Sequence, residues 1–336
     1  MSERRLLISL FLLATAAGSA FAYVPVDPNN ARGFADKVFQ VGDVDSVNVF
    51  NGNLVVRLPL GSAYSTGPTL SYQLVLTANS RVWDYEYAQY SEGPGDPVDK
   101  RRAIPETISN AGLGWTLSLG RLIPPEADTP TTSGHAWIYR APDGSEHEFF
   151  TTLRADDPPG STSVAYTTDG SYLRLTLNVE TNPTLHRVEF PGGTFHYFHA
   201  DGRLKWINDR YDNWVHVAYS SVDCDGNTAT PEMCDVWTIT DGFVNTASTR
   251  SHTVTFKNKA SKYNPANFQQ VVSTVSLAAF SGASAVYTFH YLDDGGAATS
   301  VGRGGCGDYI STDPTSVLAP LLSSVDLPDG STFEMA

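Results

Sequence analysis

The sequence has 336 residues, enough for one large domain or two modest domains with a substantial core. Its formal net charge of −14 argues against a nucleic-acid ligand and against an anionic membrane surface, because both attract proteins through Lys and Arg. Only 17% of the residues are charged, below the roughly 25% of ordinary soluble domains, and aromatic and turn-forming residues are plentiful, which favours an all-β fold.

Residues 1–22 have the pattern of a cleavable signal peptide. Two arginines form a basic start, a long apolar run follows, and Ala20-Phe21-Ala22 is a small-x-small cleavage site before Tyr23. We therefore expect the mature protein to be secreted or to lie at the cell surface. The weakly apolar run 271–289 is interrupted by Ser, Thr and Gly, so we predict two strands there rather than a membrane span.

Residues 23–125 form an N-terminal leader in which alternation with a period of two predicts strands. Asn51-Gly52 is a strong signal for a hairpin, and further strands are expected at 54–58, 70–76 and 115–119. The residues expected to share one face of each strand are Leu54, Val56 and Leu58, then Leu70, Tyr72, Leu74 and Leu76, and finally Trp115, Leu117 and Leu119.

An insertion, 81–110, interrupts this leader and is rich in aromatic residues. On an extended segment Trp83, Tyr85 and Tyr87 share one side, and Tyr90 follows before a Gly-Pro-Asp-Pro loop. Such a row can stack on sugar rings, with neighbouring carboxylates accepting hydrogen bonds from hydroxyl groups. The alternative is a strand whose aromatic side chains pack on the neighbouring sheet.

Residues 126–336 contain degenerate hairpin repeats. Three segments, 142–149, 191–198 and 328–335, share the pattern P-[DG]-G-[ST]-x-[HF]-[EY]-[FM]. Pro fixes φ early in the turn, and Gly accepts the left-handed conformation that starts the return strand. The third copy stands only one short strand from the end of the sequence, so we expect an open sheet edge that further repeats, in the same or a neighbouring chain, complete.

The segment 201–219 holds the clearest repeat. Asp201-Gly202 predicts a tight turn, after which Leu204 and Trp206 are expected on one face of a strand. The stretch 209–213 predicts a second turn whose side chains bond the nearby backbone. A further strand then follows, whose inward residues are expected to be Val215, Val217 and Tyr219.

The order D-G-R-L-x-x-I-x-D-R-x-x-N-x-x-x-x-x-Y in this segment resembles the YD repeat of the RHS (rearrangement hotspot) family, which includes bacterial polymorphic toxins and the teneurins. The family usually has Gly where this chain has Asp212. The resemblance implies a curved, open sheet of antiparallel hairpins, the start of a β-shell that wraps or presents a C-terminal cargo such as a toxin. The matching residues are Asp201, Gly202, Arg203, Leu204, Ile207, Asp209, Arg210, Asn213 and Tyr219.

The sequence offers little catalytic chemistry. Cys224 and Cys234 are expected to form a disulfide in an exported protein, with Cys306 free or paired elsewhere. His196 and His199 would lie on opposite faces of a strand, so we predict no metal site, and no cofactor motif is found. The aspartates of 201–219 sit where turns favour them, so we do not interpret them as glycosidase acids.

We therefore expect an exported, non-enzymatic structural protein, the front part of an RHS-type β-shell. The alternative is a surface adhesin or carbohydrate-binding module that uses Trp83, Tyr85, Tyr87 and Tyr90 against a cell-surface glycan. A secreted polysaccharide-active enzyme is a third hypothesis.

Overall fold

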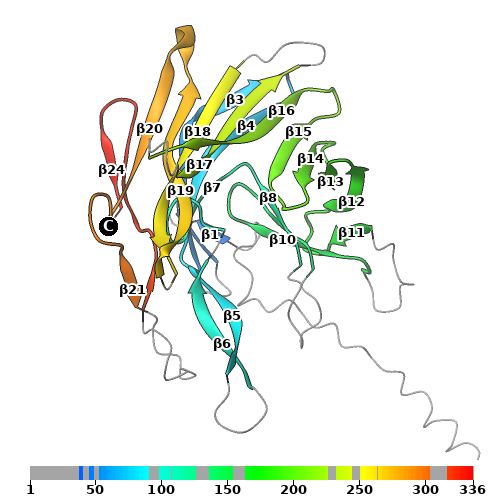
Figure 1. Ribbon diagram of the computed structural model, residues 1–336. Helices are drawn as coiled ribbons and strands as arrows, with labels where there is room; N and C mark the ends of the chain where they lie inside the picture. The colour runs from blue at the N-terminus through cyan, green and yellow to red at the C-terminus, as the bar shows by residue number, and fades with distance from the viewer. Residues whose placement is uncertain are drawn as a thin grey trace, which may run out of the picture.

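The chain folds almost entirely into β-strands, as Figure 1 shows for the computed structural model. Among the described residues the only helical element is a 3₁₀ turn, Phe280–Gly282, so none of their helices is long and apolar enough to cross a membrane. The prediction of an all-β protein with an open antiparallel sheet is confirmed. The described residues are 38–40, 45–48, 53–90, 98–106, 108–125, 136–153, 163–225, 232–243, 250–262, 264–302 and 316–335.

Within the described residues, fifteen strands form one large antiparallel sheet that follows the chain as a meander. From β8 to β20 each strand pairs with the next one in sequence, and β23 and β24 continue the sheet beyond β20. Its two edges are therefore β8 and β24. The strands are β8 (Arg121–Ile123), β9 (Ile138–Arg140), β10 (Glu146–Phe150), β11 (Val164–Thr167), β12 (Arg174–Thr181), β13 (Thr184–Glu189), β14 (Phe195–His199), β15 (Leu204–Asn208), β16 (Trp214–Asp223), β17 (Met233–Gly242), β18 (Arg250–Ser261), β19 (Asn264–Ala278), β20 (Ser284–Tyr291), β23 (Leu322–Asp326) and β24 (Thr332–Glu334).

A second, five-stranded sheet packs against the large one. Its order is β1-β2-β3-β4-β7, and Figure 1 places β3 and β4 behind β16, β17 and β18. Buried side chains of the two sheets form one hydrophobic core, to which Leu74, Leu117, Phe198, Ile239 and Phe289 belong. The protein is thus double-layered here. The strands of the small sheet are β1 (Val38–Gln40), β2 (Asp45–Asn48), β3 (Leu54–Thr66), β4 (Leu70–Asn79) and β7 (Trp115–Ser118).

Two short ribbons complete the fold. β5 (Trp83–Tyr90) pairs with β6 (Val98–Pro105), and this two-stranded ribbon projects from the body of the protein. β21 (Ser300–Gly302) pairs with β22 (Ser316–Leu318). The run predicted as two strands at 271–289 does form β19 and β20 about the 3₁₀ turn.

The predicted inward faces hold for the middle of the leader but not for its start. Leu70, Tyr72, Leu74 and Leu76 are all buried. At the start of β3 the predicted inward face was wrong, because Leu54 is 39% exposed and its neighbour Val55 is 5% exposed. Val55 lies on the same side of the sheet as Thr77 of β4, which is also buried. Asn51-Gly52 lies outside the described residues; the strands on either side of it pair antiparallel, with Val47 opposite Leu54.

The prediction that Leu204 and Trp206 share a face was also wrong. The β14–β15 register is shifted, so that Phe198 pairs with Leu204 but Tyr197 pairs with Trp206. One extra residue, Lys205, therefore lies in β15 as a β-bulge, which turns the following side chains over. As a result Leu204 and Ile207 are the buried residues of this strand, and Trp206 is half-buried on the other face.

Candidate functional site: the repeat turns and the buried polar groups

Five hairpin turns of the large sheet have the same backbone geometry, and we call them the repeat turns. In each, the first residue donates its N–H to the carbonyl four residues later and accepts a hydrogen bond from the N–H three residues later, at 2.8–3.2 Å. The residue three positions after the first has a positive φ in every case. The first residues of the repeat turns are Ala141, Phe190, His199, Asp209 and Leu327. The residues with positive φ are Gly144 (83°), Gly193 (79°), Gly202 (80°), Asp212 (61°) and Gly330 (83°).

This shared geometry confirms the predicted hairpin turns and joins two motifs that differ in sequence. The three proline-containing segments and the two turns of 201–219 are variants of one structural unit. It also explains the position at which this chain departs from the YD pattern, because Asp212 occupies the left-handed site that Gly fills in the other four turns.

Aspartate side chains hold the repeat turns in shape. The carboxylates of Asp143, Asp201 and Asp329 each accept a hydrogen bond from the backbone N–H two residues later, at 2.9–3.0 Å. Asp209 does the same with Tyr211 at 2.8 Å. These contacts support the interpretation of the aspartates as turn residues.

Asp209 additionally joins the two sheets. It accepts hydrogen bonds from the hydroxyl of Thr69, which precedes β4, and from the amide of Asn213 at 2.7 Å. Burial alone raises the pKa of Asp209, and the hydrogen bonds from Thr69, Asn213 and Tyr211 bring it below its ordinary value. Asn213 in turn packs so closely on Gly67 that a Cβ there would lie 2.5 Å from its side chain. The second turn of segment 201–219, which we call the YD segment, therefore connects the small sheet to the large one.

The first turn of the YD segment contacts β8, one of the two edge strands of the large sheet. Leu122 of β8 donates its N–H to the carbonyl of Gly202 at 3.0 Å, and Arg121 and Arg203 form an antiparallel bridge. The sheet thus curls until its β8 edge meets the β14–β15 turn. Only glycine fits at position 202, because a Cβ there would lie 1.7 Å from the Leu122 carbonyl oxygen.

The remaining residues of the YD match have packing roles. Tyr219 donates its hydroxyl to the Leu204 carbonyl at 2.6 Å, and the guanidinium of Arg203 lies 4.5 Å from the centre of the Tyr219 ring. Ile207 is buried in the core. Arg210 is exposed and stacks on Tyr211 at 4.9 Å. The segment therefore supplies turn geometry and packing.

A buried polar network links the two sheets, and no sequence pattern predicts it because its members are far apart along the chain. The Ala278 N–H donates to Nδ1 of His252 at 2.9 Å, so Nε2 carries the proton and lies 2.8 Å from the Tyr72 hydroxyl. Tyr72 donates to Asp241 at 2.9 Å. Burial lowers the pKa of His252, which keeps the ring neutral. Since Asp241 and His252 are fully buried, the network can stabilise the interface but offers no group to a substrate.

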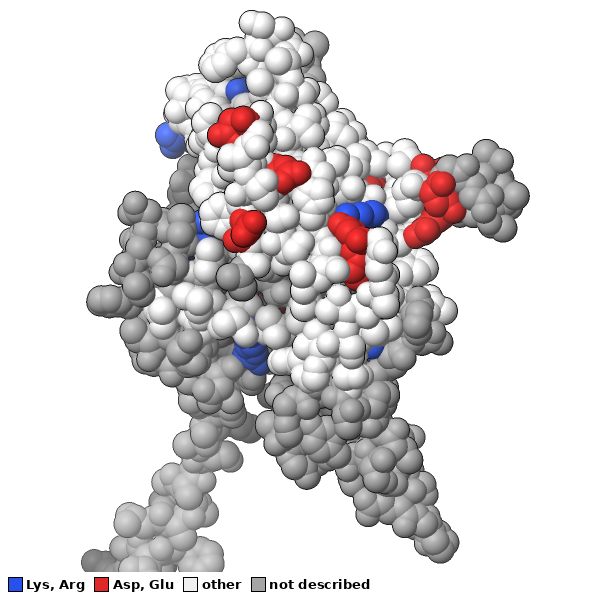
Figure 2. Space-filling model, turned by 90° about the vertical axis from the view of Figure 1, so that its left-hand side faces the viewer, with Lys and Arg blue, Asp and Glu red and all other residues white. Residues whose placement is uncertain are grey.

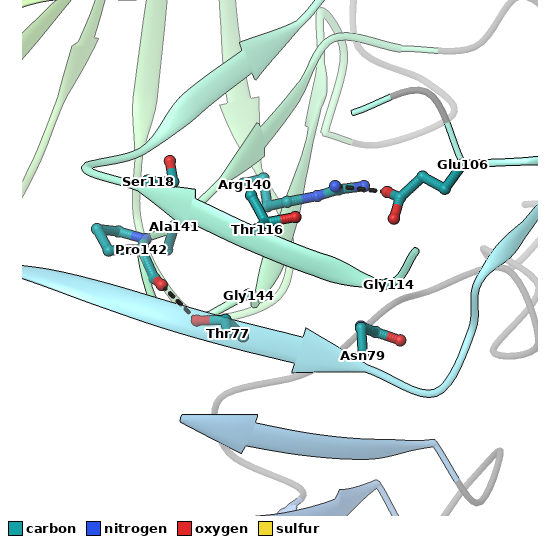
Figure 3. A pocket seen from close by; sticks show the side chains of 10 residues that line it. All are labelled: Thr77, Asn79, Glu106, Gly114, Thr116, Ser118, Arg140, Ala141, Pro142 and Gly144. Atoms are coloured by element: carbon teal, nitrogen blue, oxygen red, sulfur yellow. Dashed lines mark hydrogen bonds and ion pairs between the residues drawn. The ribbon is translucent and has the colours of Figure 1, made fainter. Parts of the chain in front are cut away.

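A second polar cluster lies beside a pocket of about 350 Å³, part of it open to solvent, shown in Figure 3. Arg140 binds the carboxylates of Glu106 and Glu146, both at 2.6 Å. The hydroxyl of Ser109 donates to the other oxygen of Glu106 at 2.8 Å. All of these groups are partnered and mostly buried, which is the arrangement of a structural ion-pair cluster.

The predicted glycan-binding residues lie on the projecting ribbon. Trp83 opens β5 and is half-buried, and Tyr85, Tyr87 and Tyr90 follow on the same strand, opposite Ala103, Arg101 and Val98. The side chains of these three tyrosines lie outside the described residues. In the strand pairing of the described residues, β5 and β6 form a two-stranded sheet of their own.

Cys224 and Cys234 are joined by a disulfide, with Cα atoms 5.7 Å apart, whereas Cys306 lies outside the described residues. His196 is buried against Tyr139 and Phe190, while His199 lies on the other face near Tyr219. The two histidines therefore do not face one site. Within the described part of the chain no three metal-binding side chains gather.

No protein-family model matches the sequence, and no curated protein matches it. Two solved structures resemble parts of the fold, the complexes TcdB2-TccC3-Cdc42 and TcdB2-TccC3. The first has a TM-score of 0.38 and 12% identity over 84% of this chain, and the second a TM-score of 0.39 and 11% identity over 89%. The alignments span 15% and 16% of the length of those chains. Likeness at this level carries no functional conclusion, and the RHS family stays a prediction.

Proposed function

We propose that this chain is an exported, non-enzymatic wall segment of a larger β-shell, whose further hairpin repeats enclose or present a cargo such as a toxin. The observation that carries this proposal is the repeat turn, which recurs five times among the described residues in one sheet whose last described strand is β24. A turn of constant geometry lets one hairpin follow another, and an open edge lets the next strand pair.

The β24 edge has few features that would block a further strand. All three of its residues are exposed, and the only charged one is Glu334. Phe333 of β24 is 44% exposed, and on β20, beyond β23, Val286 is 44% exposed and Leu292 directly after the strand is 64% exposed. Figure 2, which views the molecule from this side, shows a described surface that is mostly uncharged, with Asp and Glu more prominent on it than Lys and Arg. Natural edges that must stay free usually carry more charge.

The double layer indicates which part of a shell this segment would form. Core side chains of the small sheet fill the face of the large sheet that they contact, so no cargo fits between the two layers. A cargo space would have to lie beyond β24. We therefore assign this segment to a closed end of the shell rather than to the middle of its wall.

Export and lack of catalysis belong to the same proposal. The predicted signal peptide at 1–22 lies outside the described residues, and the Cys224–Cys234 disulfide supports an oxidising compartment. The aspartates of the repeat turns are engaged with backbone N–H groups, which supports a structural role.

The test is to find and add the missing strands. The same reading frame or an adjacent gene should encode further Asp-Gly and Tyr hairpin repeats. With those repeats supplied, the backbone amides of β24 should exchange with deuterium at least tenfold more slowly, while those of the β5–β6 ribbon keep their rates. Unchanged exchange at β24, together with a neighbourhood that encodes no repeats, would refute the shell.

A second candidate, glycan binding, is favoured by the projecting ribbon, since β5 pairs with β6 alone. The double variant Trp83→Ala, Tyr85→Ala should fold normally and lose retention on a glycan array. The control replaces two exposed tyrosines elsewhere, Tyr172 and Tyr211, by Ala and should keep it. If the unaltered protein binds no glycan, this candidate fails.

A further inference from the structure

Three arginines stand side by side where the curled sheet meets itself. Arg121 of β8 pairs directly with Arg140 of β9, and it bridges to Arg203, which directly precedes β15. Like charges at directly opposed positions of a sheet destabilise it unless each is compensated. The central residue of this row, Arg121, therefore has a cation on either side.

The two outer arginines form ion pairs with acidic residues, whereas the central one forms none with the described residues. Arg140 binds Glu106 and Glu146, and Arg203 binds Asp201 at 2.7 Å. The described residues supply the guanidinium of Arg121 with no hydrogen bond and no ion pair. Burial lowers the pKa of Arg121, Asp201 raises it, and Arg140 and Arg203 lower it further. A desolvated guanidinium without an acceptor is costly, and this cost falls when an anion binds.

The same three arginines line a pocket of about 520 Å³, part of it open to solvent. Tyr219 and Trp237 also line it and supply aromatic surface next to the charges. The pocket shares Arg140, Thr116 and Ser118 with the one in Figure 3.

We propose that this pocket binds a carboxylate group through Arg121, with the rest of the ligand against Tyr219 and Trp237. The planar guanidinium matches the two oxygens of a carboxylate. Asp201, Glu106 and Glu146 formally balance the positive charges of the three arginines. The pocket therefore offers the unused N–H donors of Arg121 but no excess positive charge. A monoanion consequently fits better than phosphate, which carries more negative charge. The carboxylate comes either from a free organic acid or from an acidic side chain of a polypeptide.

Binding is measured on the mature chain by Trp fluorescence and calorimetry, with three probes: benzoate, a blocked Gly-Glu-Gly peptide and inorganic phosphate. We expect benzoate or the peptide to bind more tightly than phosphate. Tighter binding of benzoate indicates a free acid as the natural ligand, and tighter binding of the peptide indicates an acidic side chain. Trp237→Phe should remove the fluorescence response while calorimetry still detects binding.

Three variants test the role of Arg121. Arg121→Gln should weaken carboxylate binding at least tenfold, whereas Arg174→Gln, which changes an arginine outside the pocket, should not. Without ligand, Arg121→Gln should leave the melting temperature unchanged or raise it, because it removes a cation from between two others. Asp201→Asn keeps the acceptor for the turn but frees Arg203, so it should tighten binding, and it gives a readout should Arg121→Gln fail to fold. Tighter binding of phosphate, undetectable binding of both carboxylates, equal binding by Arg121→Gln or weaker binding by Asp201→Asn would each overturn the proposal.

Discussion

Gly202 lies directly against the main chain of Leu122, so that a Cβ on Gly202 would stand 1.7 Å from the Leu122 carbonyl oxygen. The contact joins the turn between β14 and β15 to the β8 edge of the same sheet. A glycine here satisfies two requirements at once: the positive φ of the repeat turn and the close approach of another strand.

Gly330 allows these two requirements to be separated. It has the same turn geometry, with φ of 83°, but a Cβ there would meet no atom within 4 Å. Gly330→Ala should therefore cost only the backbone term, about 1 kcal/mol. Gly202→Ala should cost about 3 kcal/mol or more, because backbone atoms must also move apart. Urea denaturation of both variants measures the difference, and equal losses would mean that β8 does not pack on this turn in solution.

Asp212 is the one repeat-turn residue with positive φ that is not glycine. A non-glycine residue in this conformation is strained, although aspartate tolerates it better than most. Asp212→Gly should therefore raise the free energy of unfolding by about 0.5–1 kcal/mol, and Asp212→Ala should lower it. A loss of stability in the glycine variant would show that the Asp212 side chain has a role of its own.

His196 should make the protein sensitive to acid. Burial lowers the pKa of His196 to about 3, so the folded protein holds it neutral while the unfolded chain binds a proton near pH 6.5. The unfolded state then binds more protons than the folded state, so stability falls as the pH drops through the window between these values, by up to about 1.4 kcal/mol per pH unit.

The variant His196→Phe should therefore show a shallower loss of stability between pH 7 and pH 5 than the unaltered protein. Phe198→Leu is the control, since it disturbs the same core without removing a titrating group. Melting temperatures measured across this range decide the matter. Parallel curves for all three proteins would mean that His196 is not the acid-sensitive group.

Local sequence signals predicted the turns well and the contacts between distant segments poorly. Asp-Gly pairs specify positive φ through the chemistry of two residues, so Gly144, Gly202 and Gly330 were predictable. The β-bulge at Lys205 was not, because a pattern of period two does not record an inserted residue.

The arginine row and the Tyr72–Asp241–His252 network could not be predicted from the sequence for a different reason. Both form where β-strands from separate parts of the chain meet, and the register that brings them together is set by the curl and stacking of whole sheets. Side chains that meet only through sheet packing leave no periodic pattern along the sequence.

The Tyr72–Asp241 pair offers a test of how the two sheets are held together. Asp241 is fully buried and binds Arg250 at 2.5 Å, so Asp241→Ala removes both this ion pair and the acceptor of the Tyr72 hydroxyl and should cost about 3–5 kcal/mol. Tyr72→Phe removes one hydroxyl and should cost about 1–2 kcal/mol. Because both changes remove the same hydrogen bond, the double variant should lose less than the sum, by about 1 kcal/mol. Additive losses in chemical denaturation would show that the pair is uncoupled.

The exposed β24 edge should make the isolated mature chain self-associate. Unpaired N–H and C=O groups along an edge strand recruit other strands unless charge or cover prevents it, and β24 carries only Glu334. Size-exclusion chromatography with light scattering should therefore show oligomers whose proportion rises with concentration.

Phe333→Lys places a second charge on the β24 edge and should shift the protein towards the monomer. Phe280→Lys is the matched control: Phe280 is 98% exposed but lies in the 3₁₀ turn between β19 and β20, so its replacement should leave the association unchanged. If both variants dissolve the oligomers equally, general surface hydrophobicity and not the strand edge drives association. A compact monomer in the unaltered protein at all concentrations would remove the support that the open edge gives to the shell, and the glycan-binding ribbon would become the better hypothesis.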